Sequence, residues 1–198
     1  MKINIAIFGS TGSIGESMLD IVRKDKKNLK VVLLTANKNY KKLIEQAKEF
    51  KVKNILIYND ECYEFLKVKL KNRKINIFSR KTKLNKILKK KVDYSICGIS
   101  GLGGLKPTLE VIKFTKIIAS ANKESIICGW YLINKQLKKY NTKFIPIDSE
   151  HYSIWNLTRE YSNNDIEEII LTASGGPILN SPIKIQKTIT PEIGRAHV

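Results

Sequence analysis

The chain of 198 residues is long enough for one large domain, or for one domain and part of a second. Hydrophobic residues make up 42% of it, and no apolar run approaches the roughly eighteen residues that cross a bilayer, so we expect a globular protein without a membrane segment. The 36 Lys and Arg residues against 18 Asp and Glu give a formal net charge of +18, which permits a nucleic-acid-binding function without establishing one.

The first elements predict a strand, a glycine turn and a helix. Residues 3–8 form an apolar, strand-like run that begins directly after the first two residues, so we expect no signal peptide and a cytoplasmic location. The turn has the spacing Gly-x-x-Gly-x-x-Gly, and glycines there would let the backbone N–H groups at a helix start approach a dinucleotide pyrophosphate. A plain strand-to-helix connection is the alternative. The candidate cofactor-binding residues of this turn are Gly9, Thr11, Gly12, Ser13, Ile14 and Gly15.

The second predicted strand, residues 30–35, bears on which dinucleotide is bound. About twenty residues after the glycines, an NAD-preferring site usually carries an Asp or Glu for the ribose 2′-hydroxyl. The sequence has Asn37, Lys38 and Asn39 there instead, and a cation with amide donors suits the 2′-phosphate of NADP. The alternative for Lys38 is an ordinary solvated lysine.

The later elements continue to alternate. Helices are predicted at 40–50 and 123–140, the second after Asn122 as a cap, and strands at 54–58, 75–78, 94–97, 116–119 and 144–147, with a further one starting over 166–172. This alternation predicts an α/β fold, a Rossmann-like and mostly parallel sheet with helices on both faces, whose ligand lies beyond the carboxyl ends of the strands.

Residues 65–92 contain no acid and many lysines. They could form a nucleic-acid-binding face, but Phe65 and Phe78 are their only aromatic residues, so solvated helix faces and loops are the better interpretation. A positive field would also attract anionic ligands such as a dinucleotide. Cys62, Cys97 and Cys128 are far apart and form no Cys-x-x-Cys, so neither a disulfide framework nor a zinc site is indicated.

Three further sites carry polar residues beside strand or helix ends. Asp148 and Glu150 could point carboxylate oxygens at Mg²⁺ or Mn²⁺, although these residues by themselves favour an ordinary helix cap at Asp148 with Glu150 in the first turn. Lys123, at a helix start, could neutralise the oxygens of a bound intermediate or simply be solvated. Ser174 precedes two glycines and Pro177, a sequence that suits either a phosphate site or a tight turn.

Four motifs, taken together and in this order, resemble the 1-deoxy-D-xylulose 5-phosphate reductoisomerase family over nearly the whole chain, up to about residue 191. They are the glycine turn, residues 121–125, residues 146–151 and residues 174–177. The resemblance implies rearrangement of 1-deoxy-D-xylulose 5-phosphate on a divalent metal. An aldehyde intermediate is then reduced by NADPH to 2-C-methyl-D-erythritol 4-phosphate, for isoprenoid synthesis.

The resemblance also implies roles for individual residues. Asn122 and Glu124 would contact NADPH beside the glycine turn and residues 37–39. Asp148 and Glu150 would hold Mg²⁺ or Mn²⁺, and the catalytic set would be Lys123, Asp148 and Glu150; His151 is left out of it. The implied substrate contacts are Lys123, Ser149, Glu150 and Ser174.

The resemblance places an NADP-binding domain at 1–147 and the beginning of a catalytic domain at 148–191. Residues 192–198 look like a translated sequencing adapter, so we expect a read-through artefact there, with a divergent tail as the alternative. We expect the fragment to be inactive alone and the full-length protein to form a homodimer. The rivals are a nucleic-acid-binding module and another NADP-dependent oxidoreductase of the aspartate-semialdehyde type, which would need a nucleophilic cysteine and leaves 148–151 unexplained.

Overall fold

The computed structural model describes residues 2–69, 75–170 and 182. Contacts divide the chain into two compact units, Met1–Trp155 and Asn156–Val198. The first unit holds the whole sheet. In the second, the described residues comprise the end of one helix, the short 3₁₀ turn η3 (Asn163–Asp165) and the irregular stretch that follows.

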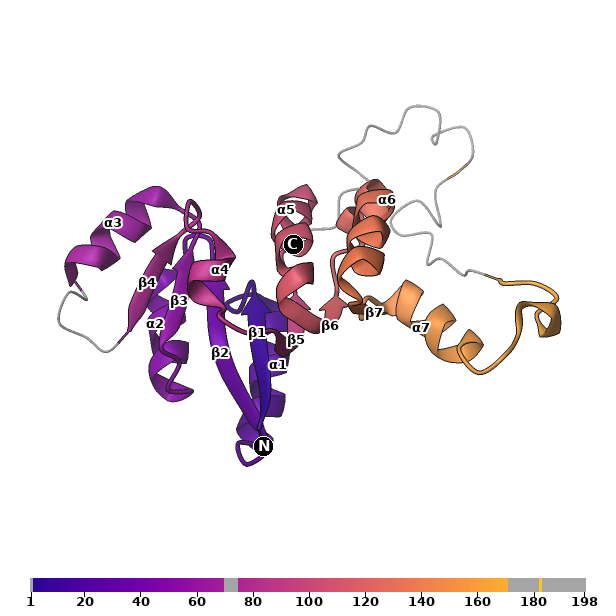
Figure 1. Cartoon of the computed structure of the whole chain (residues 1–198), viewed down its shortest axis with the longest axis horizontal. Coiled ribbons are helices and arrows are strands. Elements are labelled where there is room, and N and C mark those ends of the chain that lie inside the picture. The colour runs from indigo at the N-terminus through magenta and orange to yellow at the C-terminus, as the bar shows by residue number, and fades with distance from the viewer. Residues whose placement is uncertain (1, 70–74, 171–181, 183–198) are drawn as a thin grey trace. The chain divides into compact units, whose positions relative to one another are not determined.

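The first unit is built on a seven-stranded sheet in the order β4-β3-β2-β1-β5-β6-β7 (Figure 1). Each neighbouring pair is parallel. The strands are β1 (Ile3–Phe8), β2 (Leu29–Ala36), β3 (Asn54–Ile57), β4 (Asn76–Ser79), β5 (Val92–Cys97), β6 (Thr115–Ser120) and β7 (Lys143–Pro146). The order reverses direction at β1, which lies between β2 and β5, and such a switch point is where parallel sheets bind ligands.

A helix follows each strand. They are α1 (Ser13–Lys24), α2 (Tyr40–Glu49), α3 (Asp60–Lys69), α4 (Leu84–Ile87), α5 (Leu105–Val111), α6 (Lys123–Tyr140) and α7 (Ser149–Thr158), with 3₁₀ turns η1 (Leu102–Gly104) and η2 (Ile112–Phe114) flanking α5. Among the described residues, the structure contains no helix with the length and apolar character that a membrane span requires.

Two hydrophobic cores lie on opposite faces of the sheet. From β1, Ile5 and Ile7 join the core that receives α1 and α2, whereas Ala6 and Phe8 join the core that receives α4, α5 and α6. Side chains alternate between the faces of a strand, and helices cover both faces here. This explains why the strands appear in the sequence as continuous apolar runs rather than as alternating patterns.

Strand β2 contains an irregularity that changes which side chains face each core. Ile5 of β1 pairs with Val31, but the next residue, Ala6, pairs with Leu33, so Val32 is the extra residue of a bulge. After the bulge, Leu34 lies in the same core as Val31. The bulge sets the face that β2 presents as it reaches its carboxyl end.

The turn after β1 needs glycine at two positions for different reasons. Gly9 has φ +83°, a conformation that residues with a Cβ rarely adopt. Gly15 is buried in α1, where a Cβ would lie 2.4 Å from the Ser10 Cα atom and 2.5 Å from the Gly9 carbonyl oxygen. Helix α1 therefore packs against its own incoming turn more closely than any other residue would allow.

The predicted parallel α/β sheet is confirmed, with strand boundaries that differ by two residues or fewer. The predicted start of a strand at 166 is wrong within the described residues, because 166–170 form no strand. Ile169 and Ile170 are 56% and 76% exposed, and an apolar β-branched run cannot form a strand without a neighbour to pair with. Residues 171–172, Ser174 and the tail 192–198 lie outside the described residues, as do residues 171–181 and 183–191 of the predicted catalytic domain.

The close packing at Gly15 yields a stability prediction. We expect Gly15→Ala to lower the free energy of unfolding by about 1–3 kcal/mol, because the added methyl group overpacks the helix against the turn. The control is Gly103→Ala, where a Cβ meets nothing within 4 Å. Urea denaturation followed by circular dichroism measures both, and equal stability of the two variants would contradict the packing argument.

Candidate functional site

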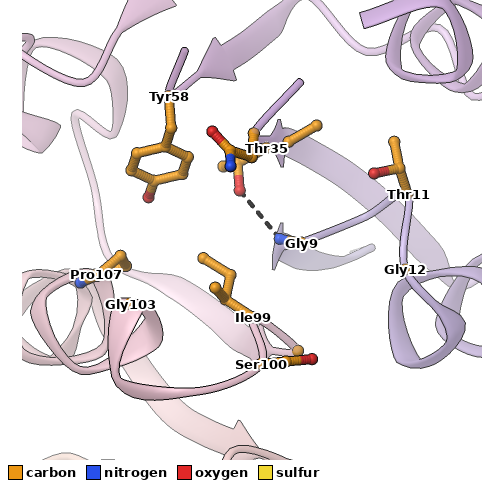
Figure 2. Close-up of a pocket in the computed structure, with 12 residues that line it drawn as sticks. Gly9, Thr11, Gly12, Thr35, Tyr58, Ile99, Ser100, Gly103 and Pro107 are labelled. Carbon is orange, nitrogen blue, oxygen red and sulfur yellow. Dashed lines mark hydrogen bonds between the residues drawn. The ribbon is translucent and has the colours of Figure 1, made fainter. Parts of the chain in front are cut away.

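A cleft of about 410 Å³ opens at the carboxyl ends of β1, β2 and β5, where the strand order reverses (Figure 2). The glycine turn forms one wall, and the segment that follows β5 forms the opposite wall. Much of the lining is backbone or small side chains. The lining residues are Gly9, Thr11, Gly12, Thr35, Ala36, Asn37, Tyr58, Gly98, Ile99, Ser100, Gly103 and Pro107.

The glycine-turn wall is fastened to the end of β2. The Gly9 backbone N–H donates to Thr35 Oγ1 at 3.0 Å, as Figure 2 shows, and the Ser10 N–H donates to the Thr35 carbonyl at 2.8 Å. Gly12 is the N-cap of α1, and a Cβ there would meet only the Gly9 carbonyl, at 3.5 Å. The protein itself would accommodate a side chain at Gly12, but that side chain would occupy space beside the cleft.

The opposite wall is held by Asn122, the N-cap of α6. Its side chain is buried, with 2% exposure, and its Oδ1 accepts from the Ser125 N–H at 2.6 Å, which confirms the predicted cap. Its Nδ2 donates to the carbonyls of Ile99 and Gly101, the second at 2.7 Å. Asn122 therefore fixes the loop after β5.

The sequence analysis did not predict the wall formed by the segment after β5. Residues 98–104 contain a cluster of glycines directly after a predicted strand, the same signal that identified the first turn. Tyr58, at the end of β3, was also missed, and its burial raises the pKa of its hydroxyl well above the ordinary value. Nothing in the local sequence distinguishes Tyr58 from any other aromatic residue at a strand end.

Of the other predicted cofactor residues, one lines the cleft and the rest do not. Asn37 lines the cleft, whereas Lys38 and Asn39 do not. Lys38 is exposed, and Asn39 caps α2 by accepting from the Lys42 N–H at 3.2 Å. Ser13, Ile14 and Gly15 form the first turn of α1 outside the lining, and Glu124 is exposed in the first turn of α6.

A second cavity, of about 750 Å³, adjoins the cleft and shares Tyr58, Gly103 and Pro107 with it. Its lining is strongly basic, because it includes Arg80, Lys81, Lys83, Lys106 and Lys113 against the single acid Glu110. Arg80 is paired with Asp60 at 2.7 Å. The remaining cations leave positive charge beside the entrance to the cleft, which favours the approach of anionic ligands.

An acidic cluster lies where β7 ends and α7 begins. Lys123 Nζ lies 3.4 Å from Glu150 Oε1, and Ser149 Oγ lies 3.1 Å from Glu150 Oε2. A hydrogen bond from its own backbone N–H, together with the Ser149 hydroxyl and the Lys123 ammonium, holds the pKa of the Glu150 carboxyl below its ordinary value. The structure thus brings Lys123, Ser149 and Glu150 together, as the predicted substrate site requires.

Asp148 shows the helix-cap geometry and also keeps a free oxygen. Its Oδ1 accepts from the His151 backbone N–H at 3.0 Å and lies 2.6 Å from His151 Nδ1. Its Oδ2 is buried and has no hydrogen-bond partner among the described residues. A buried carboxylate oxygen without a donor fits a cation ligand. Within the described ranges, however, no group of three or more His, Cys, Asp or Glu side chains could hold a metal.

The cysteines do not supply a nucleophile at the cleft. Cys97 is buried, and burial raises the pKa of its thiol to about 12. Cys62 is half-buried and Cys128 is exposed, and neither lines the cleft. A thiolate at neutral pH is therefore disfavoured at Cys97, which weakens the alternative of a dehydrogenase that acts through a cysteine.

Comparisons with family models and with curated relatives agree on one protein family. The family model described as 1-deoxy-D-xylulose 5-phosphate reductoisomerase matches residues 5–129, and that of its C-terminal domain matches residues 144–198. The reductoisomerase of Pelagibacter ubique is 54% identical over 98% of this chain and 50% of the relative, and a Wolbachia pipientis wMel reductoisomerase is 39% identical over 98% and 49%. The chain thus spans about half the length of these curated relatives.

Solved structures agree. The reductoisomerase from Zymomonas mobilis in complex with NADPH has a TM-score of 0.85 and 32% identity, over 100% of this chain and 52% of that one. A reductoisomerase in complex with NADPH, fosmidomycin and magnesium has a TM-score of 0.81 and 31% identity, over 98% and 51%.

The contact between Lys123 and Glu150 predicts a shift in titration. We expect Lys123→Met to raise the pKa of the Glu150 carboxyl only part of the way to its ordinary value, because the backbone N–H and Ser149 remain. The stabilisation from Glu150 is present above the unfolded-state pKa and is lost as pH falls through the lowered folded-state value, so the variant should lose it at higher pH. Carboxyl-carbon NMR titration measures the pKa. Lys135→Met, on the same helix, is the control, and an unmoved Glu150 pKa in Lys123→Met would contradict the assignment.

Proposed function

Because the chain belongs to the 1-deoxy-D-xylulose 5-phosphate reductoisomerase family, we propose that the whole protein converts 1-deoxy-D-xylulose 5-phosphate to 2-C-methyl-D-erythritol 4-phosphate for isoprenoid synthesis. The proposed cofactors are NADPH and Mg²⁺ or Mn²⁺. The observation that carries the proposal is the cleft at the switch point of the sheet, walled by the glycine turn and by the segment that Asn122 fixes.

The cleft supports dinucleotide binding through its backbone. Thr11 and Gly12 line it directly before α1. The Gly12 N–H donates to the Gly9 carbonyl at 3.2 Å, so the attraction for phosphate oxygens would come from the first N–H groups of α1 and from the helix dipole. The 2′-phosphate would be bound by Asn37, Lys38 and Asn39. The adjoining basic cavity adds positive charge beside the cleft. When bound, NADPH supplies the hydride and the divalent cation polarises substrate oxygens.

We place the substrate at the acidic cluster. The free Oδ2 of Asp148, with Glu150, would hold the cation, and Lys123 and Ser149 would contact the substrate from the same cluster. Lys123 begins α6 directly after Asn122, so one short segment links the cleft wall to the acidic cluster. Ser174, proposed as a further substrate contact, lies outside the described residues.

The whole protein is proposed to act as a homodimer in the cytoplasm. For the 198-residue chain alone we propose no turnover. The chain spans about half the length of its relatives, and its described acidic cluster offers fewer than three grouped metal ligands. Small misplacements of reacting groups can reduce the rate about a hundredfold. An incomplete set of metal ligands is therefore not expected to support turnover.

The loop after β2 predicts a preference for NADPH over NADH. We expect Lys38→Ala to weaken NADPH binding about tenfold and to leave NADH binding unchanged, since a charge-assisted contact of about 1.5 kcal/mol would be lost only from the 2′-phosphate. Gly12→Val should weaken both dinucleotides, because its side chain would enter the cleft, and Lys48→Ala, at the far end of α2, should change neither. Fluorescence titration measures the affinity of the wild type and of each variant for both dinucleotides; an equal loss of both dinucleotides in Lys38→Ala would refute the 2′-phosphate role.

The metal assignment is tested by substrate-dependent NADPH oxidation in the full-length protein. We expect Asp148→Asn and Glu150→Gln each to reduce turnover at least about a hundredfold while NADPH affinity stays nearly unchanged. Asp20→Asn, an exposed carboxylate on α1, is the matched control. Full activity in Asp148→Asn would overturn the metal site, whereas an inactive wild-type protein would overturn the proposed reaction.

A further inference from the structure

We propose that Gln46, on α2, is a positioning residue for the dinucleotide turn. Its buried side-chain amide holds Ser10 and thereby orients the backbone that faces the cofactor. Gln46 does not line the cleft, so this role goes beyond the contacts that a bound dinucleotide would make. The inference rests on the proposed NADPH function.

The contacts that support this proposal are made by both the nitrogen and the oxygen of the Gln46 side-chain amide. Gln46 Nε2 donates to the Ser10 carbonyl at 2.9 Å, and the Ser10 hydroxyl donates to Gln46 Oε1 at 2.8 Å. Gln46 Nε2 also donates to Glu16 Oε1 on α1. Gln46 is 3% exposed and Ser10 is fully buried, so these polar groups depend on each other for hydrogen bonds.

An amide suits this arrangement because it carries a donor and an acceptor. The Ser10 carbonyl accepts from the amide nitrogen, and the Ser10 hydroxyl donates to the amide oxygen. A carboxylate at position 46 would present oxygen to the Ser10 carbonyl and to Glu16, and an apolar side chain would remove the donor to the buried Ser10 carbonyl. Both changes therefore remove the hydrogen bond by which α2 holds the backbone of the turn.

The position of Ser10 explains how Gln46 affects the cleft. Ser10 is also bonded to the Thr35 carbonyl of β2, through its N–H at 2.8 Å and its hydroxyl at 3.2 Å. It is thus held between β2 and α2, and the residues directly after it, Thr11 and Gly12, line the cleft. A loosened Ser10 would misdirect the N–H groups at the start of α1.

Helix α2 also connects the two protein segments that are proposed to bind the 2′-phosphate and the pyrophosphate of the cofactor. It begins at its cap Asn39, in the segment proposed for the 2′-phosphate, and it holds the pyrophosphate turn through Gln46 two turns later. Lys42, between them, lies 3.3 Å from Glu16 Oε1 of α1. The helix therefore sets the distance between the 2′-phosphate segment and the pyrophosphate turn.

The test uses matched variants of α2. We expect Gln46→Glu and Gln46→Leu to weaken NADPH binding about tenfold or more, because buried hydrogen bonds at the turn are lost. Glu45→Gln makes the reverse amide exchange at the neighbouring exposed position and should bind NADPH normally. Leu43→Ala removes a core side chain from the same helix, so it should lower thermal stability without weakening binding after correction for the folded fraction.

A cofactor-free measurement separates this inference from the proposed function. Amide hydrogen exchange of residues 10–16 should accelerate in Gln46→Glu and not in Leu43→Ala. A double-mutant cycle with Ser10→Ala should show coupling, so that Ser10→Ala adds little to Gln46→Glu. Normal exchange at the turn, or an equal loss of NADPH affinity in Leu43→Ala, would overturn the role of Gln46. If the wild-type chain binds no NADPH, the proposed cofactor fails, and exchange alone decides the role of Gln46.

Discussion

The close approach of α1 to the turn after β1 is the constraint on which the cleft depends. A helix start can attract phosphates only if its first N–H groups face the ligand, and the direction of α1 is set where Gly15 packs on Ser10 and the Gly9 carbonyl. That packing leaves no room for a Cβ at Gly15. Gly9, with its positive φ, lets the chain reverse between the strand and the helix within a few residues.

Both walls of the cleft are fixed by buried amides from outside it. Gln46 holds the glycine turn, and Asn122 holds the segment after β5 through the Ile99 and Gly101 carbonyls. In the glycine turn the N–H groups of Gly9, Ser10 and Gly12 already donate within the protein, so a ligand would depend on the N–H groups that remain free. Hydrogen bonds to the backbone carbonyls from behind order the backbone without using those donors. The surface proposed to bind the dinucleotide is thus ordered in the absence of ligand, which would lower the entropic cost of binding.

The sequence predicted features that depend on neighbours along the chain. The run at β1, the helix α6 with its Asn122 cap and the first glycine turn are all local signals, and each is present. Gln46 was not predicted, because its role depends on a contact with Ser10, 36 residues away, that only the folded sheet creates. The β2 bulge was not predicted for the same reason, since it is defined by pairing with β1. The 98–104 wall could have been predicted from its glycines, which resemble the first turn.

The two interpretations of Asp148 from the sequence, cap and cation ligand, are compatible because a carboxylate has two oxygens. Oδ1 faces the His151 N–H and ring, which fixes the side chain, and Oδ2 is left buried without a donor among the described residues. A fixed, partly desolvated oxygen binds a hard cation better than a mobile one, because less ordering accompanies binding. The net charge of the chain adds to this preference of a cation for the acidic cluster. In a chain of net charge +18, a divalent cation is repelled from most of the surface. The two carboxylates of Asp148 and Glu150, with Lys123 beside Glu150 and the His151 ring beside Asp148, form the acidic cluster in which the proposed cation would be bound.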